Sequence, residues 1–160
     1  QLNNCSKVVV RKNLSTMSYY SGIAISGGSD NLVEGNELRG VRITAVNLGG
    51  NCTGMRIVDN VIVGSGYHTA WTSTGGIYLQ QVRDCVFENN HLADCTIGVR
   101  FREDCAGIVL KGTNYADCPV RVEIPACDLP RNTIDTAEAV TTIPDDQRER
   151  QGLPPLKPTP

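Results

Sequence analysis

Apolar and polar residues recur at fixed distances around a series of asparagines. Cys85 and Phe87 lie five and three residues before Asn90, and Leu92 lies two residues after it. Nearly the same spacing surrounds four more anchor residues: Asn13, Asn36, Asn60 and Thr113. The steps between successive anchors are 23, 24, 30 and 23 residues. Repeats of this length predict a solenoid in which each lap of chain stacks on the previous one.

A second apolar pattern precedes most of the anchors. It begins with glycine and alternates apolar and variable residues, as in the segments 22–25, 40–43, 76–79 and 98–101, and a last copy at 121–124 starts with arginine. Alternation with period two predicts a strand with one face inward and one outward. We therefore expect at least two strands in each lap, with the anchor asparagines stacked and hydrogen-bonded at a corner between them.

These repeats resemble the right-handed parallel β-helix of the pectin-lyase-like superfamily. The segment GIYLQQVRDCVFENNHLADC looks like its typical repeat, and the resemblance covers about residues 5–124. It implies an all-β, right-handed, single-stranded parallel β-helix of about five coils. The leucine-rich repeat is a competitor, because its strand consensus also places apolar residues around an asparagine. The β-branched composition and the second strand favour the β-helix.

The repeats predict two parts of the chain. Residues 1–124 form the β-helix, and residues 125–160, which hold seven of the eight prolines, form an extended C-terminal arm. No signal peptide is visible and the chain starts almost inside a repeat, so we expect a fragment or a processed product.

Charge and cysteine content narrow the possible partners. A net charge of −2 gives no reason to expect nucleic acid, and no apolar run reaches the roughly 18 residues of a membrane helix. There is no C-x₂-C motif among the seven cysteines and only two histidines are present, so we expect no metal and no cofactor. Cys95 and Cys118 should stack in adjacent coils. Distance permits a disulfide between them, but reduced, buried thiols are the favoured interpretation.

Three carboxylates are candidate catalytic residues. Glu34 and Glu88 occupy one outward column two coils apart, about 9.6 Å at the backbone, and Asp59 lies in the coil between them. Inverting glycosidases need carboxyl groups roughly 6.5–9.5 Å apart. The alternative is a solvated salt ladder, since Arg11 and Lys111 occupy the same column.

Two corners look enlarged, at residues 44–51 and 64–74. The second contains the aromatic residues Tyr67 and Trp71 together with His68, which could stack on and contact a sugar. The alternative is that Trp71 folds back and fills a gap beside the coil.

A third set of candidates comes from the outward column of the second strand. Arg42, Tyr78 and Arg100 combine guanidinium groups with a ring, a combination that suits a uronic acid. The catalytic motifs of polygalacturonases and alginate epimerases are absent from the sequence, so the activity stays open.

An outward stripe of apolar residues suggests self-association. It consists of Val9, Leu32, Val86 and Val109. A continuous exposed apolar stripe is expected to be covered, either by two further copies in a homotrimer or by the proline-rich end of the chain. The function expected first is a tailspike-like β-helix in a virion tail or outside the cell that binds polysaccharide. The alternatives are a polysaccharide lyase, hydrolase or epimerase, and a protein-binding module of the leucine-rich-repeat kind.

Overall fold

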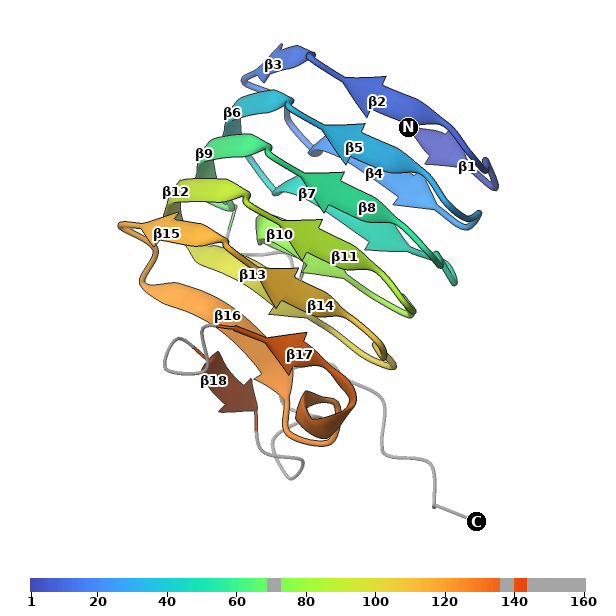
Figure 1. Ribbon diagram of the computed structural model, residues 1–160. Coiled ribbons are helices and arrows are strands. Elements are labelled where there is room, and N and C mark those ends of the chain that lie inside the picture. The colour runs from blue at the N-terminus through green and yellow to red at the C-terminus, as the bar shows by residue number, and fades with distance from the viewer. Residues whose placement is uncertain (69–72, 136–139, 144–160) are drawn as a thin grey trace.

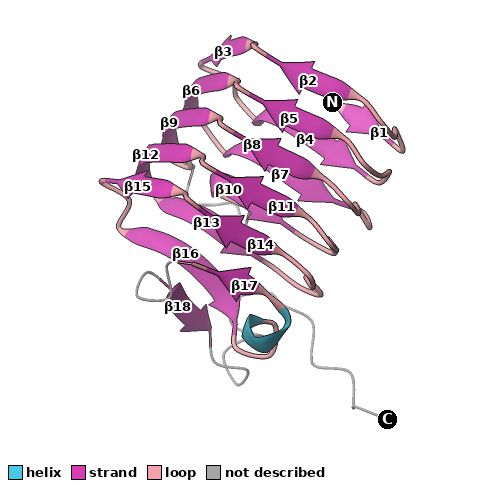
Figure 2. Ribbon diagram, viewed as in Figure 1, coloured by secondary structure: helices cyan, strands magenta, loops and turns pink. Residues whose placement is uncertain are grey.

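The computed structural model describes residues 1–68, 73–135 and 140–143, and these form a parallel β-solenoid of about six turns (Figure 1). Apart from one short 3-10 helix, η1 (Leu129–Arg131), the regular elements of these residues are strands (Figure 2). No helix among them has the length and apolar character to cross a membrane. The predicted all-β parallel solenoid is confirmed. The leucine-rich-repeat alternative is wrong, because each full lap consists of three strands.

The strands form three parallel sheets that run the length of the solenoid. Sheet A contains, in spatial order, β1 (Leu2–Asn3), β4 (Ser21–Ser26), β7 (Thr44–Gly49), β10 (Gly75–Leu79), β13 (Ile97–Phe101), β16 (Val120–Pro125) and β18 (Val140–Ile143). Sheet B contains β17 (Thr133–Ile134), β14 (Val109–Lys111), β11 (Val86–Glu88), β8 (Arg56–Val58), β5 (Leu32–Glu34) and β2 (Val9–Arg11). Sheet C contains β15 (Asn114–Ala116), β12 (His91–Cys95), β9 (Val61–Ser65), β6 (Glu37–Val41) and β3 (Leu14–Thr16).

The core fills the space between the three sheets with columns of identical or similar side chains. In sheet B, Ile57 pairs with Val33 on one side and with Phe87 on the other, and all three are fully buried. Leu38, Ile62 and Leu92 form the matching column from sheet C. Burying each such side chain contributes about 1.5–3 kcal/mol, and each lap is buried by its neighbours.

The anchor asparagines form a hydrogen-bonded ladder at the corner between sheets B and C. Asn36 Nδ2 donates to Asn60 Oδ1 at 2.9 Å, and Asn60 Nδ2 donates to Asn90 Oδ1 at 3.0 Å. Each of these carbonyl oxygens also accepts the backbone N–H of the preceding asparagine. Thr113 ends the ladder, and its buried hydroxyl has no hydrogen-bond partner among the described residues. The predicted stacking of the anchors is confirmed.

The residue before each rung adopts a left-handed backbone conformation. These five residues have φ between 53° and 61°: Lys12, Gly35, Asp59, Asn89 and Gly112. Glycine, asparagine and aspartate tolerate this region better than other residues. The backbone of the turn therefore accounts for the residue type at Asp59 without any chemical role.

One strand of sheet A lies at a different place from the one predicted. Val46 of β7 pairs with Ile23 and Ile77, so the strand of this lap covers Thr44–Gly49 and not residues 40–43. Gly40, with φ of 61°, lies next to the last residue of β6, and Val41 and Ile43 are both buried beside the bend that follows. Two buried residues flanking an exposed Arg42 imitate the alternation of a strand. The predicted enlarged corner at 44–51 is therefore wrong.

The second enlarged corner is confirmed. β9 ends at Ser65 and β10 begins at Gly75, whereas β6 ends at Val41 and β7 begins only three residues later, at Thr44. The inserted residues join sheet C to sheet A.

Strands continue beyond Pro125. β17 adds to sheet B against β14, and β18 adds to sheet A against β16. The solenoid therefore extends past the residue at which the sequence predicts its end. Residues 144–160 lie outside the described part, and an arm there stays a prediction.

Candidate functional site

The candidate catalytic carboxylates lie on sheet B and at its corner with sheet C. Glu34 and Glu88 flank Val58 in register, as predicted, so their strands are separated by about 9.6 Å. Lys111 Nζ lies 3.0 Å from Glu88 Oε1, which is the contact expected of a salt ladder. Asp59 occupies the left-handed turn position, and its backbone N–H donates to the carbonyl oxygen of Glu88. Glu88 and Asp59 thus both have structural roles.

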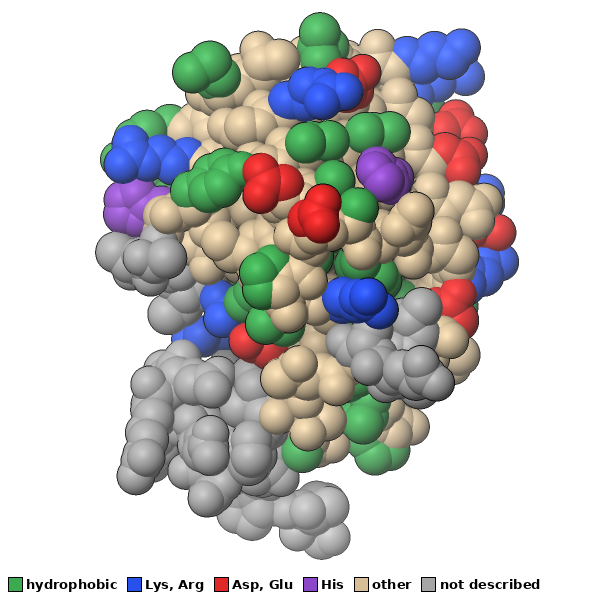
Figure 3. All heavy atoms as spheres, turned by 90° about the vertical axis from the view of Figure 1, so that its left-hand side faces the viewer, with side chains coloured by type: hydrophobic (Ala, Val, Ile, Leu, Met, Phe, Trp, Pro, Cys, Tyr) green, Lys and Arg blue, Asp and Glu red, His purple; other side chains and the backbone are tan. Residues whose placement is uncertain are grey.

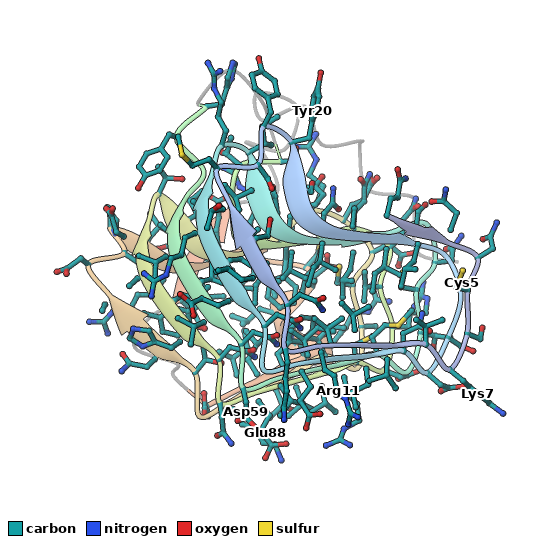
Figure 4. All side chains as sticks on the ribbon, turned by 90° about the horizontal axis from the view of Figure 1, so that it is seen from above. Cys5, Lys7, Arg11, Tyr20, Asp59 and Glu88 are labelled. Atoms are coloured by element: carbon teal, nitrogen blue, oxygen red, sulfur yellow. The ribbon has the colours of Figure 1, made fainter. Side chains whose placement is uncertain are left out.

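These carboxylates are remote from the aromatic corner of the solenoid. Viewed along the stack, Asp59 and Glu88 lie on one side of the coil and Tyr20 lies on the opposite side (Figure 4). The structure therefore does not combine the predicted catalytic residues with exposed tyrosines in one site.

The outward face of sheet A carries a largely buried polar cluster. Arg100 Nε donates to Glu123 Oε1 at 2.6 Å, and these side chains are only 19% and 14% exposed. Tyr78 is 5% exposed, its hydroxyl donates to Gln80, and burial raises its pKa. Asn47 pairs with Tyr78 at the place predicted for Arg42. The prediction that Arg42 shares a column with Tyr78 and Arg100 is therefore wrong, because Asn47 takes that place. The charge of Arg100 is balanced by Glu123.

An exposed aromatic cluster occupies the corner that leads from sheet C to sheet A, referred to below as the C–A corner. Tyr19 is 50% exposed and Tyr20 is 63% exposed, and their rings meet edge to face with centroids 4.9 Å apart. The guanidinium carbon of Arg42, from the next lap, lies 4.6 Å from the centroid of the Tyr19 ring. This is the geometry of a cation–π contact.

Backbone hydrogen bonds continue the solenoid through this corner and hold the cluster in place. The N–H of Arg42 donates to the carbonyl of Ser18 at 2.8 Å, and the N–H of Thr44 donates to that of Tyr20 at 3.1 Å. The N–H of His68 in turn donates to the carbonyl of Arg42 at 3.1 Å. The backbone of Arg42 is thus hydrogen-bonded to Ser18 of one neighbouring lap and to His68 of the other.

Tyr67 extends the same corner toward the next lap. It is 51% exposed, and its hydroxyl donates to Asp94 Oδ2 at 2.8 Å. Burial and this contact with Asp94 raise the pKa of Tyr67 to about 12. Trp71, the other aromatic candidate of this loop, lies outside the described residues.

The adjoining face of sheet C is mixed in character. Figure 3 shows acidic, basic and apolar side chains interspersed over it, without a patch of one charge. Glu37 and Arg39 form an ion pair there, and Leu14 is 67% exposed. The aromatic and cationic residues of the C–A corner are therefore more distinctive chemically than the adjoining face of sheet C.

Tyr19 and Tyr20 were not among the residues that the sequence singled out. They lie between two short polar stretches of the sequence. Arg42 was selected instead, because it lies in the second copy of the apolar pattern, which predicts a strand. Two adjacent tyrosines in a segment between strands would have been the signal.

Buried thiols do not provide a metal site. Cys52, Cys85 and Cys105 are fully buried, and burial raises the pKa of Cys85 and Cys105 to about 12. These thiols stay protonated at neutral pH, whereas metals bind the thiolate. Across the described residues, no three or more side chains of histidine, cysteine, aspartate or glutamate gather to hold a metal ion.

One protein family matches most of the chain. The family described as "Periplasmic copper-binding protein (NosD)" matches residues 1–120 of the 160. The donor groups of the described residues do not fit the copper in that description. No curated protein and no solved structure gives a significant match. The matched segment contains most of the repeats and most of the three-sheet solenoid, and the chain belongs to the NosD family.

Proposed function

We propose that this chain is a glycan-binding solenoid that acts outside the cytoplasm and holds an acidic polysaccharide at the C–A corner. The observation that carries the proposal is the placement of the Arg42 guanidinium over the ring of Tyr19, beside the exposed ring of Tyr20. The family's description as periplasmic supports a location outside the cytoplasm.

The two residue types provide complementary contacts to an acidic sugar. An exposed aromatic ring offers an apolar face on which the C–H groups of a sugar ring can stack. A guanidinium group presents a planar set of donors that matches a carboxylate. Arg42 is exposed and forms no ion pair with another described residue, in contrast to Arg39, Arg83 and Arg100. Its charge is therefore available to a ligand.

The corner is long enough for a polymer rather than a single sugar. Parallel strands rise about 4.8 Å per lap, so the distance from Tyr20 through Arg42 to His68 is about 10 Å along the axis. Tyr67, which is 51% exposed, adds further surface at that end. A glycan running parallel to the solenoid axis would contact these laps in turn.

Binding, and not cleavage, is assigned to this corner. Glu34, Asp59 and Glu88 belong to sheet B and its corner with sheet C, across the section from Tyr20. A glycan held at the C–A corner does not bring its bonds to those carboxylates.

A tailspike-like assembly is the extension of this proposal. Val9, Leu32, Val86 and Val109 are aligned on the outward face of sheet B, and Arg56 interrupts them. Val9 is 54% exposed and the other three are half-buried. A parallel homotrimer would cover this stripe and direct the C–A corner of each copy outward.

Affinity electrophoresis in gels containing a uronic-acid polysaccharide, with a neutral glucan as reference, tests the binding proposal. We expect retardation only in the acidic gel. Arg42→Gln and Tyr20→Ala should each weaken it about tenfold or more, which corresponds to about 1.4 kcal/mol.

Two matched variants complete this experiment. Arg56→Gln removes the same charge from exposed sheet B and should leave retardation unchanged, and Tyr20→Phe should keep most of it because the ring is retained. Equal losses in Arg42→Gln and Arg56→Gln would show that net charge, and not the corner, is responsible.

A further inference from the structure

Cys95 and Cys118 are in direct register on neighbouring laps. Ala93 of β12 pairs with Ala116 of β15, which places Cys95 opposite Cys118 two residues further along. Cys95 is 1% exposed and Cys118 is 8% exposed, and Cys118 Sγ donates to the carbonyl of Leu92, on the strand that carries Cys95, at 3.6 Å. Both thiols are thus buried at the end of sheet C, on adjacent laps.

This register satisfies the spacing of a disulfide. Neighbouring parallel strands lie about 4.8 Å apart, within the roughly 4.4–6.8 Å between Cα atoms that a disulfide spans. The thiol of Cys118 reaches across to the carbonyl of Leu92, so it is directed toward the lap that carries Cys95.

The other buried thiols lack this arrangement. Cys52 and Cys105 belong to one column at the corner between sheets A and B, but fully buried Val82 lies between them. Cys85 accepts a hydrogen bond from the backbone N–H of Met55, at 3.2 Å. These three residues act as small, buried side chains of the core.

We propose that Cys95 and Cys118 are a specific oxidation site, at which thiol–disulfide exchange with an external disulfide joins two successive laps of the solenoid. Outside the cytoplasm such oxidants are present and disulfides persist. The inference does not depend on glycan binding.

The exchange proceeds in two balanced steps. The thiolate of Cys118 attacks one sulfur of the external disulfide, which forms a mixed disulfide and releases one external thiolate. Cys95 then loses its proton to solvent, and its sulfur attacks Cys118 and releases the second external thiolate. The two cysteines are oxidised by two electrons, and one external disulfide is reduced to two thiols.

Cys118 is the residue that reacts first. It is the more exposed of the pair, in the turn between β15 and β16. The hydrogen bond from Cys95 also lowers the pKa of Cys118, which favours its thiolate. Cys95 is enclosed and suited to the second, intramolecular attack.

The bond would close a loop of one lap. Each lap of a solenoid contacts only its neighbours, so laps near an end can separate from the rest. A disulfide across this interface restricts the unfolded chain, and for a loop of this length we expect the Tm to rise by about 6–12 °C on oxidation.

Peptide mapping of the full chain after treatment with glutathione disulfide tests this proposal. After denaturation and alkylation we expect two of the seven thiols to be protected, and trypsin should release a linked pair of peptides, 84–100 and 112–121. Fragmentation distinguishes Cys95 from Cys85 within the first peptide. Alkylation of all seven thiols, or a bond through Cys85, would overturn the proposal.

Single variants test the order of the steps. Cys95→Ala should stop the exchange at a glutathione adduct on Cys118, whereas Cys118→Ala should leave Cys95 unmodified. Cys52→Ala, equally buried, is the control and should still form the linked peptides. An adduct on Cys95 in place of Cys118 would contradict the proposed order, and the peptide map of the unmutated chain decides the bond itself.

Discussion

Asn60 and Asn90 repeat the same hydrogen bonds one lap apart. Asn60 donates its side-chain N–H to Val33 and Val58 carbonyls and to Asn90 Oδ1, while Asn90 donates to the carbonyl of Ile57. Both side chains are buried. The ladder satisfies the backbone N–H of Asn13, Asn36 and Asn60 at successive turns between sheets B and C, so its inner rungs should be costly to remove.

Asn60→Ala should lower the free energy of unfolding by about 3 kcal/mol or more, because several buried polar groups lose their partner at about 1–3 kcal/mol each. Asn13→Ala, at the exposed end of the ladder, should cost less than about 1 kcal/mol. Urea denaturation of both variants, with unchanged m-values, provides the comparison. Similar losses at the two positions would rule out the distinction between inner and end rungs.

Thr113→Asn should stabilise the protein by about 1 kcal/mol. The Thr113 hydroxyl is buried without a partner in the described structure, and an asparagine there could accept the N–H of Asn90 as the other rungs do. Thr113→Val is the control, since it removes the unsatisfied hydroxyl without adding a rung. A thermal melt in which Asn is no better than Val would contradict extension of the ladder.

Gly76→Ala should destabilise the solenoid by about 2 kcal/mol or more. A Cβ at Gly76 would lie 2.8 Å from the carbonyl oxygen of Gly98 and 2.8 Å from Leu92 Cδ2, in a packed part of the core. Gly49→Ala is the matched control, because its nearest neighbour is 3.7 Å away and its φ is not positive. The free energies of unfolding from urea titrations should differ clearly between the two.

Tyr67→Phe should alter the alkaline titration of the protein. The pKa of Tyr67 is raised to about 12, so its contribution to stability is present below pH 10 and is lost as the pH rises toward 12. In ultraviolet difference spectra recorded against pH, Tyr67→Phe should lack the tyrosine ionisation step that occurs at the highest pH. In Asp94→Asn that step should move to lower pH, and an unchanged curve would contradict the role of Asp94.

Val86→Asp tests the proposed homotrimer. A carboxylate in the middle of the aligned stripe on sheet B would have to be buried without a partner in an assembled interface, which is strongly unfavourable. Sedimentation should show a trimer for the parent chain and a monomer for the variant. Lys111→Glu, at the C-terminal end of β14 in the same sheet, is the control, and a monomeric parent would end the proposal.

The periodic parts of the structure could be predicted from the sequence because each repeats a local chemical requirement. The asparagine column, the inward apolar columns and the stacking of Cys95 on Cys118 all follow from one register. The strand Thr44–Gly49 was missed because Gly40 to Ile43 bends around a corner with the same alternation that a strand shows.

The candidate site was harder to predict because accessibility depends on contacts between laps. Tyr78 and Arg100 occupy the outward face of sheet A, yet the ion pair with Glu123 and the surrounding side chains enclose them. Tyr20 has no distinguishing pattern in the sequence, and its exposure follows only from the position of the corner.

The nine residues between β9 and β10 leave the sheets on both sides undisturbed: Ser65 still pairs with Cys95, and Gly75 still pairs with Thr44. Folding and recognition are consequently encoded in separate parts of each lap. Loop length and composition at this corner can change during evolution, or be exchanged by a protein engineer, while the stacked scaffold that presents them is kept.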